Sequence, residues 1–158
     1  MKKAFTLIEL IFVLVIIGVL AAVAIPKFGG LIANSKVSAE LATASTIQSA
    51  LDDVHSDWII SEGSFSWGND KNESDINSQG YPKKLGNCPP AFDWILKSSS
   101  IVNAKWTCVD NGDGTFKYEG PASQADSGVN SIKEGKPDKS KHWDYNSSDG
   151  SFSLVSDS

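Results

Sequence analysis

Glu9 is the residue whose type and position most demand a chemical reason. It is the only charged residue in the 21-residue run Phe5–Ile25. A carboxylate at bilayer depth costs roughly 2.5–3.5 kcal/mol on insertion scales, and such residues are usually functional. We therefore expect Glu9 to have a specific role.

Cys88 and Cys108 offer a second chemistry. An even number of cysteines favours a disulfide in an exported chain, whereas two buried thiols are expected in a cytosolic one. The choice depends on what the N-terminus does. A disulfide would close a loop of about 20 residues and contribute roughly 3 kcal/mol, mainly by restricting the unfolded chain.

Metal, cofactor and catalytic sites find little support. His55 and His142 are far apart, and no HExxH or CxxC pattern is present. The stretch DNGDGT, residues 110–115, resembles a calcium loop but lacks the EF-hand spacing, and its Asn-Gly and Asp-Gly pairs favour a hairpin turn. No nucleophile–base pair stands out, so we predict no enzyme, no metal and no cofactor. The net charge of -5 argues against direct nucleic-acid binding.

Two asparagines lie in possible modification motifs. DKNES around Asn72 and DYNSS around Asn146 fit the extended bacterial sequon for N-glycosylation. Both lie in predicted loops, where acceptors must be. Coincidence in a chain rich in Ser and Asp is the alternative, and the motifs alone leave that choice open.

The elements that must position these residues begin with the apolar run. It is long enough to span a bilayer core as a helix, and Lys2 and Lys3 favour a cytoplasmic N-terminus. One interpretation is a signal peptide cleaved after Ala22-Val23-Ala24, and another is a plain membrane anchor. Both leave Glu9 unexplained.

A third interpretation accounts for more residues. The stretch KKAFTLIELIFVLVIIGVLAAVAIPKF resembles the N-terminus of type IV pilins and type II secretion pseudopilins. The resemblance implies a leader, residues 1–4, that a prepilin peptidase cuts between Ala4 and Phe5 before methylating the Phe5 amine. Ala4 departs from the usual Gly. Gly18 and Pro26 fall where the family has helix-weakening residues, so we predict bends there.

The same resemblance assigns a role to Glu9. In the filament of this family the N-terminal helices pack in a dry core, where the glutamate neutralises the terminal amine of a neighbouring subunit; a buried unpaired charge is very costly. The implied partners are prepilin peptidase, other pilin subunits, an inner-membrane assembly platform and, for the monomer, the membrane. The implied location is the bacterial inner membrane, with the head periplasmic, and then a periplasmic or cell-surface filament.

We therefore predict a structural subunit of a type IV pilus or of a type II secretion pseudopilus. The alternative is a membrane-anchored or secreted periplasmic binding protein with a Trp-rich head. The predicted parts are a leader (1–4), a transmembrane helix (5–26), an amphipathic stalk (27–60) and a head (61–158).

A change of apolar period follows Pro26. Apolar residues recur at steps of three and four, one face of a helix that runs from about Thr6 to Ile60: Val37, Leu41, Ala44, Ile47, Leu51, Val54 and Trp58. The residues between them, Glu40 and Gln48 included, are assigned to the polar face.

The remaining chain predicts an α+β head. After a polar connection, AFDWILK after Pro90 predicts a helix of about two turns. Residues 104–120 and 141–156 each show two alternating segments around a turn, which predicts antiparallel hairpins. We expect three or four strands packed against the long helix.

Overall fold

The computed structural model describes residues 5–62, 75–96, 105–112, 115–122 and 141–156. These residues form one long helix followed by four strands. The helix is α1 (Leu7–Ile60), and the strands are β1 (Thr107–Asp110), β2 (Phe116–Glu119), β3 (Lys141–Asn146) and β4 (Ser151–Ser156). This confirms the predicted pilin-like α+β architecture of a long helix against a small antiparallel sheet.

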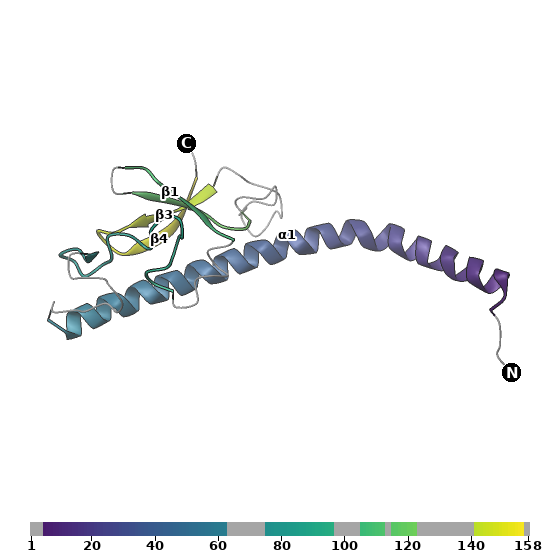
Figure 1. Cartoon of the computed structure of the whole chain (residues 1–158), viewed down its shortest axis with the longest axis horizontal. Coiled ribbons are helices and arrows are strands. Elements are labelled where there is room, and N and C mark those ends of the chain that lie inside the picture. Colours follow the sequence, from purple (N-terminus) through teal and green to yellow (C-terminus); the bar gives the residue numbers. More distant parts are fainter. Residues whose placement is uncertain (1–4, 63–74, 97–104, 113–114, 123–140, 157–158) are drawn as a thin grey trace.

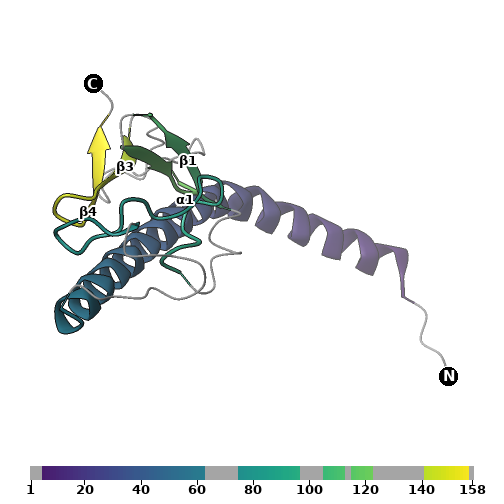
Figure 2. The same ribbon diagram turned by 60° about the vertical axis from the view of Figure 1, so that its left-hand side comes forward.

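The helix α1 has 54 residues and is therefore roughly 80 Å long. Its N-cap is Thr6, it contains Pro26, and its C-cap is Ser61, whose N–H donates to the carbonyl of Asp57. The sheet covers only its C-terminal half, and the N-terminal half extends beyond the head and is inclined to the rest (Figures 1 and 2). That Gly18 and Pro26 set this bend stays a prediction.

The four strands form one antiparallel sheet in the order β1-β2-β3-β4. β2 and β3 pair with Tyr118 opposite Trp143, and β3 and β4 pair with Tyr145 opposite Phe152. Gly150 closes the β3–β4 turn with a φ of 71°, a left-handed conformation that glycine adopts without a steric penalty. Both predicted hairpins are therefore present.

The hydrophobic core lies between the C-terminal half of α1 and the sheet. Ala44, Ile47 and Leu51 contribute the helix side. An aromatic cluster faces them, in which the rings of Trp143 and Phe152 stack at 5.2 Å. The other buried members are Leu85, Ala91, Phe92, Trp106, Phe116, Tyr118 and Tyr145. Of the predicted apolar face, Val37 and Val54 are also buried, whereas Leu41 and Trp58 are half-buried.

The predicted helix after Pro90 is wrong for the described residues up to Leu96. The chain makes a turn there, with one helical-type bond from Leu96 N–H to the Phe92 carbonyl at 3.0 Å. The reason is that this segment bonds to an earlier part of the loop. Trp94 donates to the Leu85 carbonyl at 3.2 Å, and the Asp93 carboxylate accepts from Asn87.

The candidate assembly segment and the head that carries it

The start of α1 is held by a reciprocal pair of side chains. The Thr6 hydroxyl accepts the Glu9 backbone N–H at 3.3 Å, and the Glu9 carboxylate accepts from the Thr6 N–H at 3.3 Å and from its hydroxyl at 3.1 Å. This is a capping box, which satisfies backbone donors that a helix N-terminus otherwise leaves free. Sequence reasoning missed it, although the Thr-x-x-Glu spacing before an apolar run is its signature.

Glu9 thus has two possible tasks, and the monomer already performs one of them. Its carboxylate closes the capping box while lying on the exposed surface of the helix. A carboxylate has about four acceptor positions, so these bonds leave capacity for a cation. Phe5, directly before the cap, is 83% exposed, whereas Ala4 lies outside the described residues. A terminal amine at Phe5 would therefore lie at the same exposed helix end.

Large apolar side chains cover the N-terminal half of α1 without any protein contact that buries them. Soluble monomers rarely expose a contiguous apolar surface beyond a few hundred Å². By length and composition this is a helix that could cross a membrane, with a mean hydropathy of 3.1 in its most apolar window and none of that window buried. The exposed residues include Leu7, Ile8, Leu10, Ile11, Phe12, Leu14, Val15, Ile17, Val19, Leu20, Val23, Ile25, Phe28, Leu31 and Ile32.

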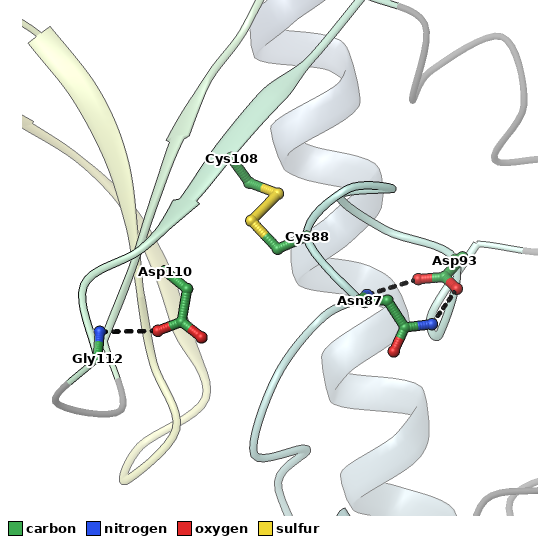
Figure 3. Close-up of a disulfide and its surroundings, with 6 residues drawn as sticks. All are labelled: Asn87, Cys88, Asp93, Cys108, Asp110 and Gly112. Atoms are coloured by element: carbon green, nitrogen blue, oxygen red, sulfur yellow. Dashed lines mark hydrogen bonds between the residues drawn. A yellow bond between two sulfur atoms is a disulfide. The ribbon is translucent and has the colours of Figure 1, made fainter.

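A disulfide between Cys88 and Cys108 fixes the loop of residues 75–96 to the sheet. It joins this loop to β1 in front of α1 (Figure 3). Next to it, Asn87 donates to the Asp93 carboxylate from its backbone and from its side chain, at 3.0 and 2.9 Å. The predicted pairing of the two cysteines is confirmed.

Glu40 corrects the assignment of the helix faces. We expected this residue on the polar face, but it is fully buried. Its two carboxylate oxygens accept from the Trp143 indole N–H at 2.8 Å and from the Ala122 backbone N–H at 2.7 Å. A side chain on Gly120 would collide with it, so the glycine permits the close approach. The spacing 37, 40, 44, 47 puts Glu40 on the apolar face, and this signal was overlooked.

Gln48, also assigned to the polar face, is half-buried and contacts the outer edge of β4. Its amide donates to the Gly150 carbonyl and accepts the Phe152 N–H, at 3.1 and 3.0 Å. These are backbone groups that an edge strand otherwise leaves unpaired. The helix therefore continues the hydrogen bonding of the sheet through one side chain.

The remaining predicted residues do not converge on one site. Asn146, expected in a loop, is instead the last residue of β3 and is exposed, and Asn72 lies outside the described residues. In the β1–β2 hairpin the Asp110 carboxylate accepts the Gly112 N–H at 2.8 Å, a local turn bond. Within the described part of the chain, no three His, Cys, Asp or Glu side chains gather in a way that could hold a metal ion.

Comparisons with known proteins agree with this geometry. Residues 1–25 match the family described as the prokaryotic N-terminal methylation motif. The type IV major pilin protein PilE1 of Neisseria gonorrhoeae is 30% identical over 153 residues, covering 90% of this chain and 91% of that protein. The type IV major fimbrial protein FimA of Dichelobacter nodosus is 44% identical over 52 residues, and this match spans 33% of each protein. No solved structure shows significant similarity to the chain.

Proposed function

This chain belongs to the type IV pilin family, a structural and non-enzymatic family, and from that premise we propose that it polymerises through α1 into a type IV pilus. The observation that carries the proposal is the exposed apolar half of α1 beside a head that has its own buried core. The head gains nothing from this half, which therefore serves contacts outside the monomer. The names of PilE1 and FimA favour a pilus over a type II secretion pseudopilus.

Processing by a prepilin peptidase supplies the mature N-terminus in this proposal. The leader is residues 1–4, the cut falls between Ala4 and Phe5, and the same enzyme methylates the Phe5 amine. The methylation motif over residues 1–25 supports this. After cleavage the new amine lies next to the capping box of Thr6 and Glu9.

The monomer resides in the inner membrane until it is assembled. In the precursor, Lys2 and Lys3 hold the N-terminus on the cytoplasmic side, residues 5–26 span the bilayer, and the head faces the periplasm. An assembly platform then lifts the helix out of the lipid into a filament of like subunits. The apolar surface of α1 passes from one apolar surrounding to another, so the transfer needs little change in its solvation.

Glu9 sets the axial position of each incoming subunit. A terminal ammonium in the dry filament core costs several kcal/mol unless a carboxylate meets it. The Glu9 carboxylate is the acidic group in the apolar run, so the pair forms only when two helices dock at the matching step. The same charge also explains why an acidic residue persists within this run.

The substitution Glu9→Gln tests this role. Glutamine keeps the shape of the side chain and serves equally well as the third helical residue of a capping box. It removes only the negative charge. We expect a normal level of membrane-inserted subunit and a loss of surface filaments, measured by membrane fractionation and by electron microscopy of sheared fibres.

Thr6→Ala is the matched control, because it removes the hydroxyl cap and keeps the charge. It costs about 1 kcal/mol at the helix start and should leave filaments in place. Normal filaments from Glu9→Gln would refute the charge pairing, and equal loss from both variants would assign the requirement to the cap. Mass spectrometry of the mature N-terminus completes the test, since N-methyl-Phe5 supports the pilin and Ile25 would indicate an ordinary secreted binding protein.

A further inference from the structure

The sequence around one exposed asparagine fits a modification motif that filament formation does not require. Of the nine asparagines, two are followed by a serine two positions later, Asn72 and Asn146. Both also have an aspartate two positions before, although acidic residues make up 19 of the 158 positions, about one in eight. The bacterial acceptor motif for N-linked glycans has this pattern, D/E-x-N-x-S/T, so its full form occurs at every Asn-x-Ser in the chain.

The structure describes the motif around Asn146 completely. Asn146 is the last residue of β3, opposite Ser151, and is exposed. Asp144 lies two residues earlier, so both side chains are on the face of the strand away from the core, and the Asp144 side chain is 47% exposed. Tyr145 between them is buried and its hydroxyl donates to the Pro82 carbonyl at 2.7 Å. The two recognised side chains thus face solvent while their neighbour anchors the strand.

The side-chain amide of Asn146 is engaged through its oxygen. Its Oδ1 accepts the Ser148 N–H at 3.0 Å and is also contacted by the Ser148 hydroxyl. Within the described residues its Nδ2 makes no hydrogen bond, so the nitrogen is available for reaction. Asn146 and Ser148, the two polar residues of the Asn-x-Ser motif, are therefore in contact at the start of the β3–β4 turn.

Asn77 provides the contrast within the same chain. It also has an aspartate, Asp75, two residues before it, but its Nδ2 donates to the Ser147 carbonyl. Its Oδ1 accepts the backbone N–H groups of Gln79 and Tyr81, both at 3.0 Å. Every polar atom of this side chain is engaged, and its position in the fold leaves no nitrogen to react.

We propose that Asn146 is an acceptor for an N-linked oligosaccharide on the periplasmic head. In the transfer, Asn146 Nδ2 forms a bond to the anomeric carbon of a polyprenyl-pyrophosphate-linked oligosaccharide. The bond from that carbon to the pyrophosphate oxygen breaks, the lipid pyrophosphate leaves with the electron pair, and Nδ2 gives up one proton to the transferase. The reaction requires export of the head but not filament assembly, so its outcome is separable from that of the proposed function.

The test co-expresses the full chain with a bacterial oligosaccharyltransferase and a lipid-linked oligosaccharide of known mass. An Asn72→Gln background leaves Asn146 as the remaining full motif. The expected result is a gain of one glycan mass, mapped to Asn146 by peptide sequencing. The gain should fall at least tenfold in Ser148→Ala and disappear in Asn146→Gln. A bare polypeptide mass, while an acceptor peptide in the same cells is modified, would overturn the proposal.

A new motif at Asn77 separates the role of the structure from that of the sequence. Gln79→Ser, in a chain that also carries Asn72→Gln and Asn146→Gln, completes the pattern Asp-x-Asn-x-Ser around Asn77. The backbone donors to Asn77 are unchanged by this substitution, so we expect no glycan there. The proposal states that an exposed asparagine with an unbonded Nδ2 is the acceptor. Modification of Asn77 to the level of Asn146 would overturn it.

Discussion

Two glutamates of α1 lie in apolar surroundings and differ in their partners. Glu40 is fully buried, and both carboxylate oxygens accept hydrogen bonds from the head. Glu9 is exposed on the apolar half and bonds within its own helix turn. A buried carboxylate is tolerated when donors surround it, whereas an exposed one in a future filament core needs a counter-charge. The first therefore belongs to the fold, and the second is the residue that we propose for assembly.

Glu40→Gln should destabilise the head by about 1.5–3 kcal/mol, the range for hydrogen bonds to charged groups. Glutamine offers one oxygen, so its NH₂ group would face either the Trp143 or the Ala122 N–H. Urea unfolding of the full chain in detergent, followed by tryptophan fluorescence, measures the change. Asp53→Asn, exposed on the same helix, should alter stability by less than about 0.5 kcal/mol. An unchanged midpoint for Glu40→Gln would show that these donors find other acceptors.

At the scale of elements, one segment of the head, residues 75–96, contains neither an α-helix nor a β-strand. The described residues 75–96 form turns and one isolated bridge between Ile76 and Pro82. Few backbone bonds hold this loop, yet Leu85 and Phe92 from it fill the core. The Cys88–Cys108 disulfide compensates by tying the loop to β1, which keeps these side chains against the sheet.

Removing the disulfide by Cys88→Ser with Cys108→Ser should cost about 3 kcal/mol, because the bond closes a loop with a sequence separation of 20. The urea midpoint of the full chain, with and without reductant, measures this. Reductant should lower the midpoint of the native chain and leave the double variant unaffected. Equal midpoints for oxidised and reduced native protein, with reduction verified by thiol labelling, would contradict the assigned role.

The whole molecule divides into an apolar half of α1 and a head with an aromatic core. Tyr118 and Tyr145 lie in that core, and burial raises the pKa of each hydroxyl above its usual range. A raised folded-state pKa means that stability is intact below the unfolded pKa, about 10, and is lost as the pH rises above it. The head should therefore be sensitive to alkali.

We expect the free energy of unfolding to fall above about pH 10, by up to roughly 1.4 kcal/mol per pH unit for each of the two tyrosines. Tyr145→Phe should remove the contribution of Tyr145 to this pH dependence. It also removes the hydrogen bond to the Pro82 carbonyl. Urea unfolding at pH 9 to 11, with tyrosinate absorbance recorded in parallel, tests this. The same slope in both proteins would exclude Tyr145 as a source of the alkaline sensitivity.

The sequence alone determined the features that depend on neighbours along the chain. The apolar spacing placed the helix, and the glycine-containing turns placed both hairpins, because these signals act within a few residues. The dense N-terminal motif pointed to the family, since the residues that carry the match, 1–25, are contiguous in the chain.

Only the tertiary structure decided which polar groups serve the core. The spacing along α1 can place Glu40 on the apolar face, but it does not show which groups bond to Glu40 and Gln48, because their partners lie 82 to 104 residues away. The expected helix after Pro90 is replaced by a turn, in which the Trp94 N–H donates to the Leu85 carbonyl and the Asp93 carboxylate accepts from Asn87. A local pattern contains no information about donors that arrive from a distant strand, and a buried polar side chain is stable only when they do.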